Sequence, residues 1–269
     1  MSMVFASSQT ITSYRINLIK VVTLAVCLSL WEILSRSGLF YAGIMPSIVL
    51  VVKALGSELT DRSFYHDLGL TMLESSVGFV FGSILAIALG IMLGISRYFR
   101  RMAMPYIVSI GATPKIIFLP IIFLIFGIGI ESKMAKGAMS AFFPVVLSTT
   151  SGFLLIPPVI LRVGESFALS RWQMATKIYF PAMAVPLMTG LRLGIAVSTI
   201  GVLAAEITYA NAGLGYRLIN SAEQYKIPQM YATMILIFVV AGTINWVMTR
   251  ILAATSRHQR SQASLSALG

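Results

Sequence analysis

The stretch that decides the fold runs from Ser75 to Ser96 and reads SSVGFVFGSILAIALGIMLGIS, without a charged residue. About 20 consecutive apolar residues carry an α-helix across the hydrocarbon core of a bilayer. No water reaches the backbone there, so a spanning segment must be a helix or a strand of a closed barrel. The run is too long and too continuous for a barrel strand. It therefore predicts a transmembrane helix.

Five other apolar runs flank this one. A weaker first run covers residues 16–31, and the others cover residues 102–130, 137–161, 178–205 and 227–249. The last four contain only two charged residues, Lys115 and Arg192. The whole chain is 57% hydrophobic and 11% charged, whereas soluble domains average about 25% charged residues. We expect an all-α membrane protein with six transmembrane helices in one bundle.

Lysine and arginine between the runs predict the orientation, because cytoplasmic loops are enriched in both. With the N-terminus in the cytoplasm, the inside holds eleven, namely Arg15, Lys20, Arg97, Arg100, Arg101, Arg162, Arg171, Lys177, Arg250, Arg257 and Arg260. The outside then holds seven, namely Arg36, Lys53, Arg62, Lys133, Lys136, Arg217 and Lys226. Topology thus explains the net charge of +11 without nucleic acid. Both termini are expected in the cytoplasm.

This topology divides the chain into three parts. Residues 1–14 are expected to form a cytoplasmic segment, residues 15–254 a six-span transmembrane domain, and residues 255–269 a disordered cytoplasmic tail. An apolar stretch at residues 48–55 is too short to span and predicts an interfacial helix outside the membrane.

The loop between the fourth and fifth runs has the most specific local pattern. Pro157-Pro158 predicts the end of the fourth span. Ser170-Arg171-Trp172-Gln173 is a capping box, in which Ser170 caps a helix that begins at Arg171. Pro181 is expected to end that helix or to turn the chain into the fifth span. The result is a cytoplasmic hairpin of two short helices at about residues 159–180, which local pattern alone cannot tell from a plain connector.

Residues 165–181, ESFALSRWQMATKIYFP, resemble the cytoplasmic loop of binding-protein-dependent ABC importer permeases. The family loop begins Glu-Ala-Ala, has Gly after three more residues, and ends Ile-x-Leu-Pro. Here Arg162-Val163-Gly164 stands at the start, Ala168 at the Gly position and Ile178-Tyr179-Phe180-Pro181 at the end. The capping box is similar to that of the nitrate, sulfonate, taurine and bicarbonate branch. Other stretches between residues 31 and 247 also resemble this branch, namely Thr113-Pro114-Lys115, Leu119-Pro120, Phe126-Gly127, Ala141-Phe142-Phe143-Pro144, Thr189-Gly190-Leu191-Arg192 and Gly213-Leu214-Gly215-Tyr216.

The resemblance implies a type I importer-like permease bundle in a bacterial inner membrane. Its hairpin would be the coupling helix that docks on a separate ATPase. Implied partners are a second permease copy, two cytoplasmic ATPase subunits and an extracytoplasmic substrate-binding protein. ATP and Mg²⁺ would lie on the ATPases, because this chain lacks a Gly-x-x-x-x-Gly-Lys-Ser/Thr loop, and no cofactor is expected here. The implied substrate is a small anion such as a sulfonate, nitrate, bicarbonate or an aromatic acid.

Residues implied to couple the hairpin to the ATPase are Arg162, Glu165, Ser166, Ala168, Ser170, Arg171, Trp172 and Gln173. Glu165 lies one helical turn after Arg162, so we hypothesise that it replaces the acid missing from the start of the loop. Trp172 is either an aromatic anchor in the partner's groove or a tryptophan at the membrane interface.

Ionisable residues at membrane depth are candidates for the translocation pathway. Lys115 either lines the pathway, where it could neutralise a substrate anion, or pairs with an acid. Arg192 is expected to pair with an acid more than to serve the pathway. Glu206, with Asn211 beyond it, forms an outer gate or caps a helix. Glu32 and Glu74 lie near predicted span ends, which favours surface pairing or snorkelling.

Small residues in the runs leave two questions open. Thr149 and Ser198 either line the pathway or serve helix packing, and packing is favoured. Gly78 with Gly82, and Gly90 with Gly94, have the Gly-x-x-x-Gly spacing of close helix contacts. That spacing fits a packed bundle or a dimer interface equally well.

The alternative function is an ion-driven secondary transporter, which would use the same charges but leaves the capped hairpin unexplained. An enzyme is disfavoured, because His66 and His258 are the only histidines and no HExxH or Gly-x-Ser-x-Gly motif is present. No catalytic or metal site is predicted, and Cys27 is expected to be a small buried apolar residue.

Overall fold

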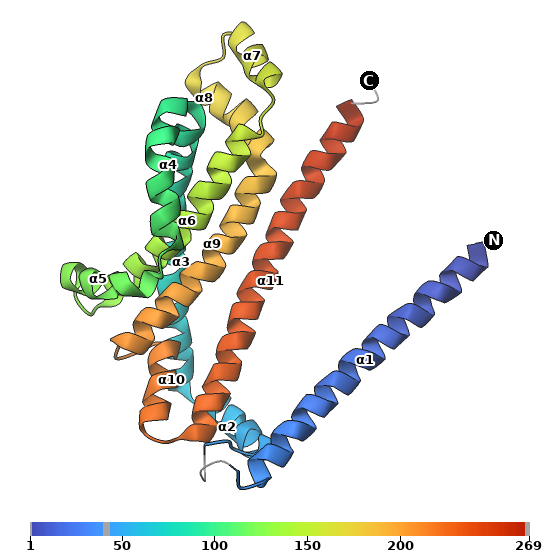
Figure 1. Cartoon of the computed structure of the whole chain (residues 1–269), viewed down its shortest axis with the longest axis vertical. Coiled ribbons are helices and arrows are strands. Elements are labelled where there is room, and N and C mark those ends of the chain that lie inside the picture. The colour runs from blue at the N-terminus through green and yellow to red at the C-terminus, as the bar shows by residue number, and fades with distance from the viewer. Residues whose placement is uncertain (1, 40–43, 267–269) are drawn as a thin grey trace. The chain divides into compact units, whose positions relative to one another are not determined.

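The computed structural model describes residues 2–39 and 44–266, and every regular element in that part of the chain is helical (Figure 1). The elements are α1 (Ser2–Arg36), α2 (Ile48–Thr60), α3 (Arg62–Ile95), α4 (Arg97–Ala112), η1 (Lys115–Phe118), α5 (Leu119–Phe126), α6 (Ile130–Leu154), α7 (Pro158–Ser166), α8 (Arg171–Met174), η2 (Ala175–Tyr179), α9 (Phe180–Thr208), α10 (Leu214–Glu223) and α11 (Ile227–Ser266). The predicted helical class is confirmed.

Two compact units make up the chain. The first comprises the chain up to Asp61 with Asn220–Ile235, and the second comprises Arg62–Ile219 with the chain from Leu236 onward. In the first unit Glu32 joins two elements, because it accepts a hydrogen bond from Arg36 (2.7 Å) and another from the backbone N–H of Ile48 (3.0 Å). Glu32 therefore pairs locally, as predicted, and also satisfies the N-terminus of α2.

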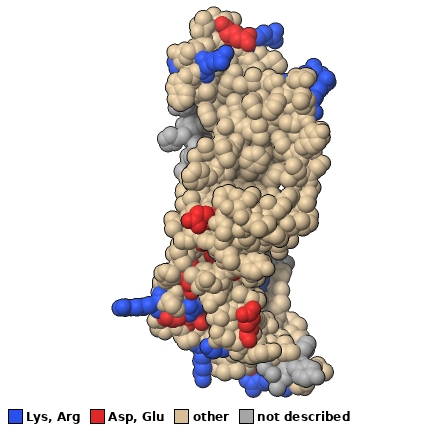
Figure 2. Space-filling view, turned by 90° about the vertical axis from the view of Figure 1, so that its left-hand side faces the viewer, with Lys and Arg blue, Asp and Glu red and all other residues tan. Residues whose placement is uncertain are grey.

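Within the described residues, five helical stretches are long and apolar enough to cross a membrane. They are Ile16–Arg36, Arg62–Ile95, Ile130–Leu154, Arg171–Thr208 and Ile227–Ile251. A sixth exists if α4 and η1–α5 count as one span, but these two are bent by 96°. Figure 2 shows a broad band without charged side chains on one face, as expected for a surface in lipid.

The predicted third span is broken where a proline interrupts it. Thr113 has an extended backbone with ψ of 139°, because the ring of Pro114 disfavours the helical conformation of the residue before it. The helix restarts after the bend, with Pro120 in the first turn of α5, where a missing N–H costs little. Residues 102–130 therefore do not form the straight helix that hydropathy suggests.

Helices α3, α6 and α9 lie side by side and form the centre of the second unit (Figure 1). A Cβ on Gly78 would lie 2.6 Å from the carbonyl oxygen of Met134, and one on Gly82 would collide with the carbonyl of Ala138. Gly90 and Gly94 meet the side chains of Thr149 and Phe153 in the same way. Both Gly-x-x-x-Gly pairs thus serve contact between α3 and α6 within this chain, which answers the question that their spacing left open.

Three charged residues lie elsewhere than predicted. Lys133 and Lys136, expected in an outer loop, belong to α6 and are 5% and 2% exposed. Glu74, expected near a span end, is 4% exposed, because α3 begins twelve residues before it at Arg62. A span predicted from hydropathy stops at the first charged residue, whereas α3 and α6 continue past the charged residues that they contain.

Helix α1 begins at Ser2, and α11 continues to Ser266. Cys27, which was predicted to be buried, is exposed. At residues 48–55 the predicted short helix is present as α2, and it extends to Thr60.

Candidate functional site

Residues close together in the chain determine where the two arms of the hairpin between α6 and α9 begin. Helix α6 ends at Leu154, and α7 begins at Pro158, directly after Pro157. The capping box is present as predicted, because the Ser170 hydroxyl accepts from the Gln173 N–H (3.3 Å) and the Gln173 side chain accepts from the Ser170 N–H (2.9 Å). Two of the N–H groups that lack partners within the helix at the start of α8 are thereby satisfied.

The end of α7 is a Schellman motif without its usual glycine. The Leu169 N–H donates to the carbonyl of Gly164 (3.1 Å), and the Ala168 N–H donates to that of Glu165 (2.9 Å). This motif needs a left-handed residue, which glycine supplies most often. Ala168 takes that position with φ of 47°. It is also the position at which the resembled family has Gly, so the turn keeps its shape at a conformational cost.

Gly164 brings the two arms of the hairpin together. It is buried, and a Cβ at this position would lie 2.5 Å from both Met174 and Ile178. The two large aromatic side chains at the turn point away from this contact, with Phe167 76% and Trp172 75% exposed. Arg162, Glu165, Ser166 and Arg171 are exposed beside them. The hairpin is a fixed element with an accessible, partly aromatic surface.

Pro181 does not end the second arm, which was one of its two predicted roles; the chain passes through it into the fifth span. Helix α8 passes into the π-helical turn η2 and then into α9, and together they form one helix from Arg171 to Thr208. A proline clashes with the carbonyl four residues earlier, and the wider π turn directly before Pro181 accommodates that ring. The hairpin is therefore continuous with the fifth span.

A cavity of about 740 Å³ lies where the third span breaks, between α4, η1, α6 and α9. Lys115 lines it as the first residue of η1, and Lys136 lines it from α6. The Lys115 ammonium donates to the carbonyl of Gly111 (2.7 Å), and that of Lys136 donates to the carbonyl of Lys115 (2.6 Å). The sequence did not identify Lys136 as a cavity residue, because the charge pattern predicted that it lies in an outer loop.

The other predicted pathway residues lie outside this cavity. Thr149 and Ser198 are buried and bind the carbonyls of Val145 (2.7 Å) and Ser75 (3.0 Å), which supports the packing interpretation. Arg192 donates to the side-chain oxygen of Asn245 (3.0 Å). Its partner is therefore an amide and not the acid that was predicted. Asn211 is exposed in the loop between α9 and α10.

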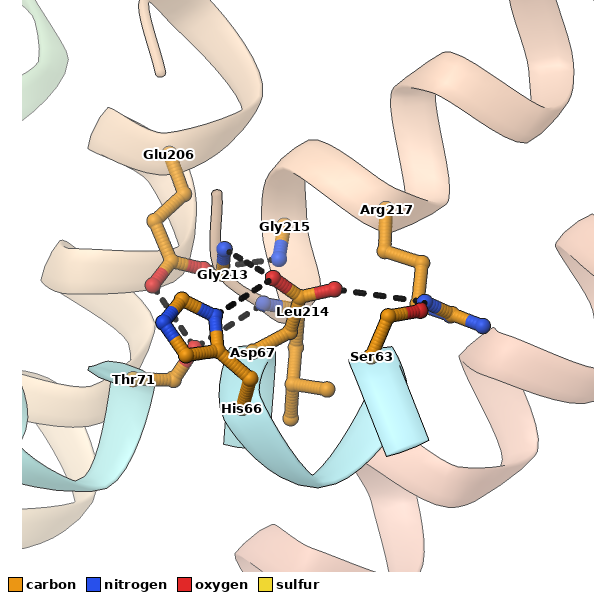
Figure 3. Close-up of polar contacts among 9 residues, drawn as sticks. All are labelled: Ser63, His66, Asp67, Thr71, Glu206, Gly213, Leu214, Gly215 and Arg217. Atoms are coloured by element: carbon orange, nitrogen blue, oxygen red, sulfur yellow. Dashed lines mark hydrogen bonds and ion pairs between the residues drawn. The ribbon is translucent and has the colours of Figure 1, made fainter. Parts of the chain in front are cut away.

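Glu206 is the centre of a buried polar network (Figure 3). One carboxyl oxygen accepts from the hydroxyl of Thr71 and the other from the N–H of Gly215, both at 2.7 Å. Thr71 in turn accepts from the N–H of Leu214 at 2.9 Å.

Asp67 completes this network. It accepts from the N–H of Gly213 (3.0 Å) and pairs with Arg217 (3.3 Å). Three successive N–H groups at the start of α10 therefore meet side chains of α3 and α9. Because the first N–H groups of a helix have no partners within it, the network fixes the start of α10. Glu206 is a helix cap, one of its two predicted roles, although the helix that it caps is the next one.

Known proteins match the chain over most of its length. Residues 78–261 match the family described as binding-protein-dependent transport system inner membrane component. The chain is 24% identical to the putative aliphatic sulfonates transport permease protein SsuC of Bacillus subtilis (strain 168), over 85% of this chain and 82% of that protein. It is 26% identical to the taurine transport system permease protein TauC of Escherichia coli (strain K12), over 81% and 82%. For the nitrate import permease protein NrtB of Synechocystis sp. (strain PCC 6803) the identity is 25%, over 86% and 85%.

A solved structure shares the fold. The inward-facing MetNI methionine ABC transporter matches with a TM-score of 0.63 at 17% identity, over 71% of this chain and 95% of that chain. Together with the helical architecture, this likeness confirms a type I importer permease fold. The chain belongs to the inner-membrane components of binding-protein-dependent transport systems, as a multi-pass permease subunit of an ABC transporter.

Proposed function

We propose that this chain forms the translocation pathway of an importer and receives motion from separate ATPase subunits through the hairpin at residues 159–180. The observation that carries the proposal is the exposed pair Phe167 and Trp172 on a turn that is capped on both sides. Exposed aromatic side chains on a rigid element are typical anchors of protein interfaces. They provide a surface on which an ATPase subunit can dock.

The route from this surface into the membrane is short. Helix α8 is continuous with α9 as far as Thr208, and α7 is packed on α8 and η2 through Gly164. A displacement of the hairpin therefore acts directly on a helix that spans the bilayer. Packed elements of this kind shift as bodies between discrete arrangements, which suits alternating access.

The proposed assembly contains two copies of this chain, two cytoplasmic ATPase subunits with ATP and Mg²⁺, and an extracytoplasmic substrate-binding protein. Both termini and the hairpin face the cytoplasm. Relatives named for aliphatic sulfonates, taurine and nitrate support a small anion as the substrate. The two lysines at the cavity are compatible with that class.

A binding experiment tests the docking surface. Trp172→Ala in the full chain should reduce co-purification of a co-expressed ATPase subunit about tenfold or more, the loss expected for an interface anchor. Trp246→Ala is the matched control, because Trp246 is also an exposed tryptophan but lies on α11. Equal loss in both variants, or none in Trp172→Ala, would show that the hairpin does not dock.

Glu165 is tested in the same complex. We infer that its exposed carboxylate pairs with a basic group of the ATPase in place of the acid that Arg162 displaces. Glu165→Ala should then lower transport-coupled ATP hydrolysis, and Glu165→Asp should restore part of it. Uptake in proteoliposomes that continues without ATP and stops when an ion gradient collapses would instead support a secondary transporter.

A further inference from the structure

Two lysines at the broken third span face a cavity without an acid. Lys115 and Lys136 both line it, and Lys136 is almost fully buried. Within residues 2–39 and 44–266, neither ammonium group forms an ion pair, that is, neither lies within 4.0 Å of a carboxylate. The Lys136 ammonium instead lies against the backbone of Lys115, a second cationic residue. Two cations in an apolar setting without a counter-charge are unfavourable.

The lysines also have donors to spare. An ammonium group carries three donor hydrogens. In the described structure Lys115 uses one for the carbonyl of Gly111 and Lys136 uses one for the carbonyl of Lys115. The remaining hydrogens can bind the oxygens of an anionic group, and hydrogen bonds between two charged groups are stronger than neutral ones.

The rest of the cavity wall is apolar. Phe143 lies with its ring centroid 5.2 Å from the Lys115 ammonium, and Val108, Leu147, Val197 and Ile200 also line this open cavity. The volume of about 740 Å³ falls in the range of pockets for organic ligands. A bare inorganic ion such as nitrate would leave these walls uncovered.

We propose that this cavity is a binding site for an organic anion, in which Lys115 and Lys136 hold a sulfonate or carboxylate and the apolar wall holds its hydrocarbon part. The proposal rests on the proposed function, because its ligand would be the imported substrate. It places a site for selecting the substrate on the permease itself. Bound there, the anion would connect Lys115 of η1, at the break in the third span, with Lys136 of α6, in the next span.

A calorimetric titration tests the site without the ATPase or the binding protein. The full chain, reconstituted in lipid nanodiscs, is titrated with 1-hexanesulfonate, and with 1-hexanol and nitrate for comparison. We expect 1-hexanesulfonate to bind, and Lys115→Met or Lys136→Met to weaken its binding about tenfold or more, as for the loss of one charge-assisted contact. Lys53→Met removes an exposed lysine of α2 and should leave binding unchanged.

Lys136→Arg separates a lost site from a damaged fold. It keeps the charge, so it should bind 1-hexanesulfonate more tightly than Lys136→Met at the same thermal stability. Undiminished binding in both methionine variants, or equally tight binding of 1-hexanol, would overturn the proposal. Equally tight nitrate would overturn the organic class. Failure of the proposed function would show separately, as binding that persists while ATP drives no uptake.

Discussion

At the scale of single residues, Ala168 shows how a local motif survives an unfavourable side chain. Its φ of 47° is left-handed, which costs a residue with a Cβ about 1 kcal/mol relative to Gly. Ala168→Gly should therefore stabilise the turn and slow deuterium exchange in peptides that cover residues 163–175. Ala175→Gly, at a helical φ of −60°, should speed exchange there, because Gly loses more entropy in a helix. Faster exchange in Ala168→Gly would contradict the left-handed turn.

Glu206 is the residue on which the start of α10 depends. Both carboxyl oxygens are acceptors, for Thr71 and for the N–H of Gly215. Glu206→Gln retains only one acceptor oxygen, so one buried donor loses its partner at a cost of about 1–3 kcal/mol. We expect a lower melting temperature of the detergent-solubilised chain. Glu223→Gln, at the exposed far end of α10, should have no such effect, and equal melting of the two variants would argue against the cap.

At the scale of elements, the contact between α3 and α6 depends on the absence of side chains. A Cβ at Gly82 would meet the backbone of Ala138, which cannot move away without displacing α6. Gly82→Ala should cost about 1–3 kcal/mol, as overpacking does. Gly69→Ala makes the same change on α3 in open space and should be neutral or stabilising by up to about 1 kcal/mol. Thermal unfolding of both variants in detergent provides the comparison, and equal stability would exclude tight packing at Gly82.

An element could be predicted from the sequence where the residues that form it are close together in the chain, and could not where they are far apart. The capped hairpin was predictable, because Pro157 acts on its chain neighbours and Ser170 and Gln173 form a capping box within four residues. The burial of Glu74, Lys133 and Lys136 was not, because the groups around them come from distant or unforeseen segments, as when Lys136 binds the carbonyl of Lys115. The break at Thr113-Pro114 is a local effect, but hydropathy averages over it. The continuity of α8 with α9 depends on a π turn that no residue pattern announced.

At the scale of the whole molecule, the distribution of lysine and arginine along the chain predicts the orientation in the membrane. Eleven lysines and arginines lie on the predicted inside against seven on the predicted outside. Both termini should then be cytoplasmic. In a Cys27→Ala background, Ser261→Cys should react with a membrane-impermeant maleimide only after permeabilisation, and Asn211→Cys should react in intact spheroplasts. The reverse labelling pattern would show the inverted topology. The hairpin would then face away from the side of the membrane where ATP is available, which would contradict the proposed coupling.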